Sequence, residues 1–148
     1  MTDLEMVPNA SCVAIGGYGL LIEGEVGSGK SSLALALIDR GAVLVGDDGI
    51  ALERRGDALW ALPPPNITGS LHVRGVGIFD MPCAAAQLSL SLWLEQKMNY
   101  TVLPVPRNRM LEGIVLPQLS LRGDDPYLPL RAESALAKYG LPLAGTMV

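Results

Sequence analysis

The sequence is poor in aromatic residues, histidine and cysteine, and it lacks the segments that mark secreted and membrane proteins. Aromatic residues make up 5% of its 148 residues, and it has one histidine and two cysteines, Cys12 and Cys83. Because the cysteines form no metal-binding spacing, we expect reduced structural thiols. The acidic residues 1–8 lack the basic and apolar segments of a signal peptide, and no apolar run approaches the roughly 18 residues of a membrane span. We therefore expect a cytoplasmic protein with no membrane partner.

The charge balance points away from nucleic acid as a partner. The formal net charge is −4, and the 11 basic residues are scattered along the chain, whereas nucleic-acid sites need clustered positive charge. With 49% hydrophobic residues, a chain of this length has enough apolar side chains for one core. We see no internal repeat and no long linker, so we predict a single domain over residues 1–148.

The most informative motif is GEVGSGKS at residues 24–31, which fits the P-loop pattern G-x-x-x-x-G-K-[ST] at every fixed position. An apolar run over residues 20–22 precedes it as a strand would. Residues 31–38 are good helix formers and lead to Gly41, a predicted C′ glycine. The backbone N–H groups of such a loop, together with the helix N-terminus, bind phosphate. The alternative is a glycine-rich turn that binds nothing, which would have to match four fixed positions by accident.

We therefore predict that this segment binds a nucleoside phosphate. Lys30 is expected to reach the β- and γ-phosphates, and the Ser31 hydroxyl is expected to ligate Mg²⁺. The predicted nucleotide-binding residues are Gly24, Glu25, Val26, Gly27, Ser28, Gly29, Lys30, Ser31 and Ser32.

Two adjacent carboxylates follow the next predicted strand. Residues 42–46 are apolar and lead directly to Asp47 and Asp48. A Walker B strand also delivers an aspartate to the metal, so we expect both carboxylates to lie beside the γ-phosphate. One could hold Mg²⁺, directly or through water, and the other could accept the proton of an attacking hydroxyl. The alternative is an Asp-Asp-Gly turn between two strands.

The remaining pattern predicts many strands and few helices, unlike a regular βαβ alternation. A loop is expected over residues 98–113, an interruption at Pro117, and a short helical turn capped by Asn66. A closing helix is expected over Arg131–Tyr139. The predicted strands cover residues 11–15, 19–22, 42–46, 49–52, 58–62, 87–95 and 114–121.

A third segment, LHVRGVGI at residues 71–78, contains paired glycines and Arg74. Its backbone could approach a phosphate closely, and a strand with a bulge explains it equally well. Together the P-loop, LVGDD at residues 44–48, Pro63 and Pro64, and residues 71–78 resemble the HPr kinase/phosphorylase family. The resemblance covers roughly residues 9–80, and the chain length is similar to that of short alphaproteobacterial members, which consist of the C-terminal catalytic domain.

The resemblance implies an α/β fold related to phosphoenolpyruvate carboxykinase, with strand-rich mixed sheets around a P-loop helix. It implies transfer of a phosphoryl group from ATP or pyrophosphate to a serine of an HPr-like phosphocarrier protein, the reverse phosphorolysis, and a hexamer. Asp48 corresponds to the catalytic base and Asp47 to its neighbour on the metal side. Arg74 lies in the signature segment, and a downstream catalytic arginine corresponds to Arg109.

The chain departs from the family at four positions. The histidine that the family carries upstream of the P-loop lysine corresponds to Asn9, and a P-loop serine is replaced by Val26. Gly46 replaces the usual alanine before the aspartates. His72 replaces a glutamate that helps to bind magnesium, and imidazole is a poor ligand for hard Mg²⁺. A metal site of Ser31, Asp47 and His72 would therefore tolerate Mn²⁺.

Three functions are consistent with this sequence. The first is an active HPr-type serine kinase/phosphorylase with a modified metal site, which the retained lysine, serine, aspartates and Arg74 favour. The second is a nucleotide-binding regulatory protein that has lost most turnover, which the changes at Asn9 and His72 favour. The third is a small-molecule kinase, for which the sequence shows no acceptor pocket.

Overall fold

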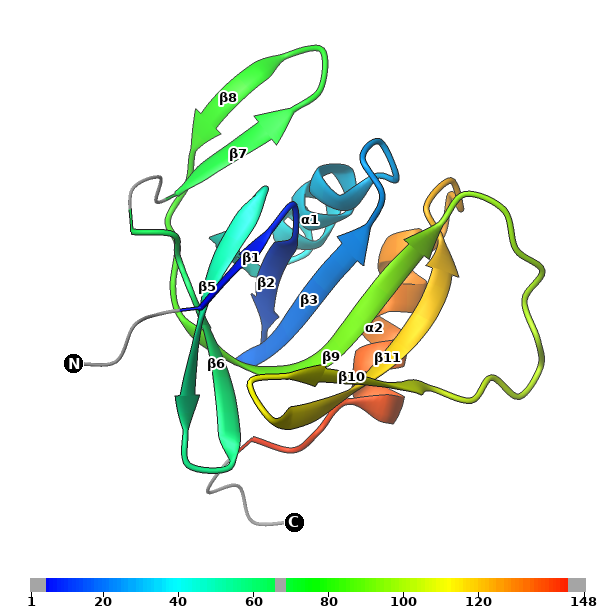
Figure 1. The fold of residues 1–148 in the computed structure, drawn as a ribbon. Helices are drawn as coiled ribbons and strands as arrows, with labels where there is room; N and C mark the ends of the chain where they lie inside the picture. Colours follow the sequence, from blue (N-terminus) through cyan, green and yellow to red (C-terminus); the bar gives the residue numbers. More distant parts are fainter. Residues whose placement is uncertain (1–4, 66–68, 144–148) are drawn as a thin grey trace.

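The computed structural model describes residues 5–65 and 69–143. Strands dominate this part of the chain, and two helices accompany them (Figure 1). The strands are β1 (Glu5–Pro8), β2 (Ser11–Ile15), β3 (Tyr18–Gly24), β4 (Val43–Gly46), β5 (Gly49–Arg55), β6 (Ala58–Leu62), β7 (Ser70–Val73), β8 (Gly77–Asp80), β9 (Ala86–Glu95), β10 (Arg107–Leu111) and β11 (Ile114–Arg122). The helices are α1 (Lys30–Asp39) and α2 (Leu128–Tyr139).

The main sheet is mixed and branches at β9. Its strand order is β1-β5-β6-β9-β3-β2-β4, and β11 also pairs with β9. β3 runs parallel to β9, whereas β6 pairs antiparallel with the start of β9 and β11 pairs parallel with its end. β10 folds back on β11 as an antiparallel hairpin. The strand-rich mixed α/β architecture expected from the sequence is confirmed.

Apolar side chains fill both faces of this sheet, because alternate residues of its strands point to opposite sides. Along β3, Leu20 and Ile22 pack on one face, whereas Leu21 packs on the other. Buried residues of α1 and α2, such as Leu37 and Ala132, cover the first face. β1, β5 and β6 contribute to the second cluster. Both cysteines are free, and burial raises the pKa of the Cys12 thiol above its usual range.

The helix that follows the P-loop ends as the sequence predicted. Gly41 has a φ of 109°, and its N–H donates to the carbonyl of Ile38, while the N–H of Ala42 donates to the carbonyl of Leu37. These two bonds form a Schellman motif, which satisfies carbonyls at the helix end and requires a left-handed residue. In the described residues no helix is long and apolar enough to cross a membrane.

Three local expectations need correction, and one falls outside the described residues. β10 lies inside the segment 98–113 that we expected to be a loop. β11 continues through Pro117, because the parallel pairing with β9 begins only at Gln118 and the missing N–H breaks no bond there. α2 begins at Leu128 rather than Arg131, with a proline in its first turn, where the absent N–H costs nothing. The turn expected at Asn66 lies outside the described residues.

The signature segment forms a hairpin of β7 and β8 that stands apart from the main sheet (Figure 1). Gly75 occupies its turn with a φ of 81°. Leu71 is fully buried in the cluster beneath α1, whereas Ile78 is 74% exposed. The hairpin therefore has one strand anchored in the core, β7, and one largely exposed strand, β8.

Candidate active site

The P-loop joins the end of β3 to the start of α1. Three of its glycines have positive φ angles: Gly24 (157°), Gly27 (81°) and Gly29 (104°). The Ser28 N–H closes the turn by donating to the Glu25 carbonyl at 3.0 Å. The first N–H groups of any α-helix lack partners within the helix, so the start of α1 supplies donors for an anion. The Ser28 hydroxyl is buried without a hydrogen-bond partner among the described residues.

Lys30 folds back over the loop that precedes it. Its Nζ donates to the carbonyl oxygens of Gly24 and Glu25, at 2.9 Å each. An ammonium group strongly favours anionic acceptors over neutral carbonyls. The lysine is therefore held at the mouth of the loop by groups that a phosphate would outcompete.

Asp47 accepts hydrogen bonds from three directions. The hydroxyls of Ser11 and Ser31 both donate to its Oδ1 at 2.7 Å, and the main-chain N–H of His72 donates to its Oδ2 at 3.1 Å. The carboxylate thereby joins β2, the first turn of α1 and β7. The two hard oxygens of Ser31 and Asp47 are the donor type that Mg²⁺ prefers.

Asp48 and Asn9 have unusual backbone conformations. Their φ angles are 57° and 62°, in the left-handed region that side chains other than glycine rarely adopt. Such strain costs on the order of 1 kcal/mol or more and is typical of functional sites. Both residues border the P-loop pocket, so the strain falls beside the predicted phosphate position.

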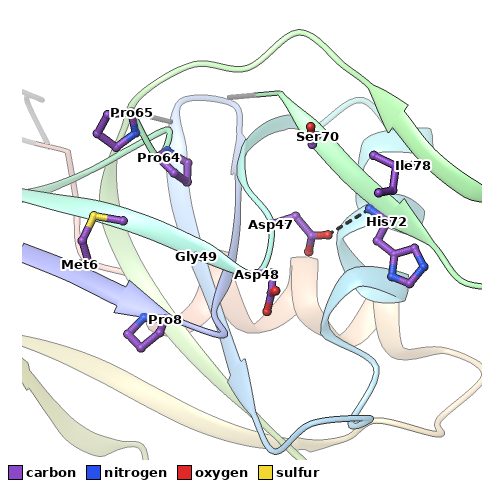
Figure 2. Close-up of a pocket in the computed structure, with 10 residues that line it drawn as sticks. All are labelled: Met6, Pro8, Asp47, Asp48, Gly49, Pro64, Pro65, Ser70, His72 and Ile78. Atoms are coloured by element: carbon purple, nitrogen blue, oxygen red, sulfur yellow. Dashed lines mark hydrogen bonds between the residues drawn. The ribbon is translucent and has the colours of Figure 1, made fainter. Parts of the chain in front are cut away.

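Two pockets meet at the paired aspartates. The P-loop pocket, of about 470 Å³, is bordered by loop residues, by the aspartates and by His72 and Arg74 of the hairpin. A second pocket, of about 520 Å³, lies on the other side of the pair and has mostly apolar walls (Figure 2). Met6, Pro8, Pro64, Pro65 and Ile78 provide those walls. Asp47, Asp48 and His72 border both pockets.

His72 contacts the acidic pair through its backbone. The dashed line in Figure 2 joins Asp47 to the main-chain nitrogen of His72, whereas the imidazole ring points away from that carboxylate. Among the described residues, no group of three or more His, Cys, Asp or Glu side chains is placed to hold a metal ion. The residues present suit a cation that brings ligands of its own, as Mg²⁺ does with nucleotide phosphates.

The departure at Gly46 has a steric cause. A Cβ at this position would lie 2.6 Å from the carbonyl oxygen of Gly49, 2.9 Å from Ile50 Cγ2 and 3.1 Å from Pro64 Cδ. Glycine therefore allows the turn that presents Asp47 and Asp48 to close against Pro64. The sequence alone gave no reason for this glycine.

The structure does not bring Arg109 to the other predicted site residues. Arg109 lies on β10, borders neither pocket described above, and donates to both carboxylate oxygens of Glu23 at 3.0 and 2.9 Å. These hydrogen bonds raise the pKa of its guanidinium above the usual value.

Sequence reasoning missed two polar residues next to the site, Ser11 and Glu23. Ser11 reaches Asp47 because β2 pairs with β4, which no local motif reveals.

Comparison with known proteins shows which family this chain resembles. The model of the HPr serine kinase C-terminal domain matches residues 4–85. The HPr kinase/phosphorylase of Clostridium novyi (strain NT) is 42% identical over 91 residues, which are 62% of this chain and 29% of the relative. That of Cupriavidus pinatubonensis is 40% identical over 93 residues, 62% of this chain and 28% of the relative. The chain thus spans less than a third of the length of these curated relatives.

A solved structure extends the similarity beyond the matched segment. The HPr(Ser) kinase/phosphatase from Coxiella burnetii superposes with a TM-score of 0.80 at 31% sequence identity. The superposition covers 90% of this chain and 88% of that one, so it includes most of the segment from β9 to α2, which the family model does not match. The chain belongs to the family of the HPr serine kinase C-terminal domain.

Proposed function

We propose that this chain is the catalytic domain of an ATP-dependent serine kinase/phosphorylase whose acceptor is an HPr-like phosphocarrier protein. The observation that carries the proposal is the contact between Ser31 and Asp47, at 2.7 Å, beside the P-loop lysine. It brings a hydroxyl and a carboxylate to the place where a metal bound to nucleotide phosphates needs ligands. The names of the relatives supply the reaction class and the acceptor.

Each group of the site has a part in this proposal. The P-loop amides and Lys30 bind the phosphates of ATP or pyrophosphate, and Lys30 exchanges its two carbonyl partners for phosphate oxygens. Ser31 and Asp47 hold Mg²⁺, which supplies charge neutralisation when bound, and Mn²⁺ substitutes for it at the same oxygens. Arg74, on the hairpin, faces the same pocket as a further cation.

Asp48 is the proposed general base. It borders both the P-loop pocket and the apolar pocket, so a hydroxyl entering from the apolar side meets its carboxylate before it meets the phosphates. A base at this point accepts the proton of the attacking serine. In the proposal the acceptor segment therefore approaches past Met6, Pro64 and Ile78.

Two of the predicted roles rest on the resemblance alone. The catalytic role predicted for Arg109 gains no support from its contacts, and the ligand role predicted for His72 gains none from its imidazole. Assembly into a hexamer also remains a prediction.

The second candidate is a nucleotide-binding regulatory protein with little turnover. His72 in place of a carboxylate favours it, because no third carboxylate lies with Asp47 and Asp48 among the described residues. Its binding properties would equal those of the kinase, so only transfer of the phosphoryl group separates the two.

The deciding experiment incubates the protein with γ-labelled ATP, Mg²⁺ or Mn²⁺, and the HPr-like proteins of its own organism. A kinase places the label on a serine of one of them, and Asp48→Asn removes that label while nucleotide binding persists. Nucleotide binding without any transfer to protein would favour the regulatory protein. Transfer to a small alcohol instead would favour a small-molecule kinase using the apolar pocket.

A further inference from the structure

A buried polar cluster lies directly behind the P-loop, and the proposed reaction does not use it. The Glu23 side chain is 10% exposed, and its carboxylate receives hydrogen bonds from Ser91, Gln118 and Arg109. Gln118 also donates to the Ser91 hydroxyl at 2.9 Å. The donors thus saturate the carboxylate, as a buried charge requires.

The cluster joins four strands on the sheet face opposite the two helices. Glu23 belongs to β3, Ser91 to β9, Arg109 to β10 and Gln118 to β11. Glu23 follows Leu21 by two residues, so it shares the face of Leu21, whose cluster contains no residue of α1 or α2. The hairpin of β10 and β11, which is distant in sequence, is therefore fixed to Glu23, the strand residue that immediately precedes the P-loop.

Glu23 immediately precedes the two residues that hold the P-loop lysine. Lys30 Nζ is bound by the carbonyls of Gly24 and Glu25. A Cβ on Gly24 would lie 2.5 Å from Ser28 Oγ and 3.1 Å from the Leu94 carbonyl, so this backbone packs tightly on its neighbours. Any movement of Glu23 would consequently shift the loop and its lysine.

Charge makes Arg109 the critical member of the cluster. An unpaired carboxylate behind an anion-binding loop would repel the phosphates and would also be costly to bury. Arg109 neutralises Glu23 with two parallel hydrogen bonds, at 3.0 and 2.9 Å. Arg109 therefore allows Glu23 to hold the end of β3 in place without leaving a net negative charge behind the P-loop.

We propose that Glu23 and Arg109 are positioning residues that fix the P-loop from behind, and that Arg109 does not contact the nucleotide. The part of this inference that concerns nucleotide affinity rests on the proposed function. The part that concerns the order of the loop in the free protein stands without it.

The first measurement is hydrogen–deuterium exchange of the full chain without nucleotide. Arg109→Met should raise exchange over residues 24–32 by about tenfold or more, because a buried unpaired carboxylate destabilises that region. Exchange in β5 should stay unchanged, and the double variant Glu23→Gln/Arg109→Met should return the loop to near wild-type exchange. Unchanged exchange over residues 24–32 in Arg109→Met would overturn the proposal. If Arg109→Met does not fold, Arg109→Lys takes its place, with a smaller increase expected and the same overturning result.

The second measurement is the affinity for a fluorescent ATP analogue with Mg²⁺. Arg109→Met should weaken binding by about tenfold, and Glu23→Gln/Arg109→Met should restore it to within about threefold of the wild type. The control is Arg55→Met, which removes the exposed ion pair with Glu53 and should leave binding unchanged.

The outcomes separate the two proposals. If the double variant binds as weakly as Arg109→Met, the guanidinium itself contacts the nucleotide and the positioning role is wrong. If the wild type binds no nucleotide, the proposed function is wrong, while the exchange data still decide whether the pair orders the loop.

Discussion

The hydroxyl of Ser31 donates to Asp47 Oδ1 at 2.7 Å, so the residue after the P-loop lysine touches the carboxylate at the end of β4. The short helix α1 makes this possible, because the chain returns at once to the sheet through the Schellman motif at Gly41. Ser11 binds the same oxygen at the same distance. Two hydroxyls and one carboxylate therefore form a single cluster of oxygen ligands beside the P-loop.

Lys30→Ala should weaken the binding of a fluorescent ATP analogue by at least about tenfold. A charge-assisted hydrogen bond contributes roughly 1.5–3 kcal/mol, and alanine provides neither the charge nor the donor. Titration at fixed Mg²⁺ measures the effect, with Lys97→Ala, outside both pockets at the site, as the control. Equal affinities for Lys30→Ala and the wild type would show that the nucleotide binds elsewhere.

Asp48→Asn should reduce phosphoryl transfer by about 100-fold while leaving nucleotide affinity nearly intact, because it removes a positioned base. Asp47→Asn should instead raise the Mg²⁺ concentration required for transfer, since a ligand oxygen loses its charge. Transfer rates measured over a Mg²⁺ titration distinguish these effects. The reverse pattern in the two variants would exchange the roles that we assign to them.

His72→Glu should strengthen Mg²⁺ binding and raise transfer supported by Mg²⁺ relative to Mn²⁺. A carboxylate is a better ligand than imidazole for the harder ion, and position 72 borders the P-loop pocket next to Asp47. Transfer rates with each metal provide the test, and His72→Gln, which adds no charge, is the control. No change in metal preference would place the side chain outside the metal shell and leave only its N–H bond to Asp47.

Gly123→Ala should impair nucleotide binding although Gly123 lies outside every motif. A Cβ there would lie 2.0 Å from the carbonyl oxygen of Ser28, so the alanine would push the P-loop backbone outward. We expect a cost of about 1–3 kcal/mol in the free energy of unfolding, as in other overpacked sites, and weaker ATP-analogue binding. Gly56→Ala is the control, because its φ of 64° makes alanine strained although the surrounding space is open. That variant should lose stability only, and normal binding by Gly123→Ala would refute the prediction.

Asp125 should make stability depend on pH in the acid range. The N–H of Tyr127 and, less strongly, the Tyr100 hydroxyl and Arg131 lower the pKa of this carboxyl below its usual value. Because the folded protein binds the proton less tightly than the unfolded chain, the stabilisation is present above about pH 4 and is lost as the pH falls further.

Urea unfolding of the wild type and Asp125→Asn at several pH values tests this. The difference in the free energy of unfolding should be largest at pH 7 and should shrink below about pH 4. Asp124→Asn is the control, because that side chain is 61% exposed and its pair with Arg122 contributes little. A difference that stays constant with pH would show that the charge of Asp125 does not stabilise the fold.

The P-loop, its helix and the terminating glycine at position 41 could be predicted from the sequence because they depend on local conformation. Glycines at positive φ, good helix formers and a Schellman motif act within a few residues of one another. Seven of the nine strands of the main sheet, all except β1 and β10, were also predicted, because alternation or a short apolar run along one segment marks a buried strand.

Only the tertiary structure decided which distant residues meet. Ser11 touches Asp47 because β2 and β4 pair with a register shift between Cys12 and Val13, and Arg109 neutralises Glu23 because β10 folds back on β11. The segment of β10 has no clear hydrophobic period, so its strand forms through pairing rather than through its own pattern. Pairing register depends on contacts between residues far apart in the chain, and a single sequence carries no direct record of those contacts.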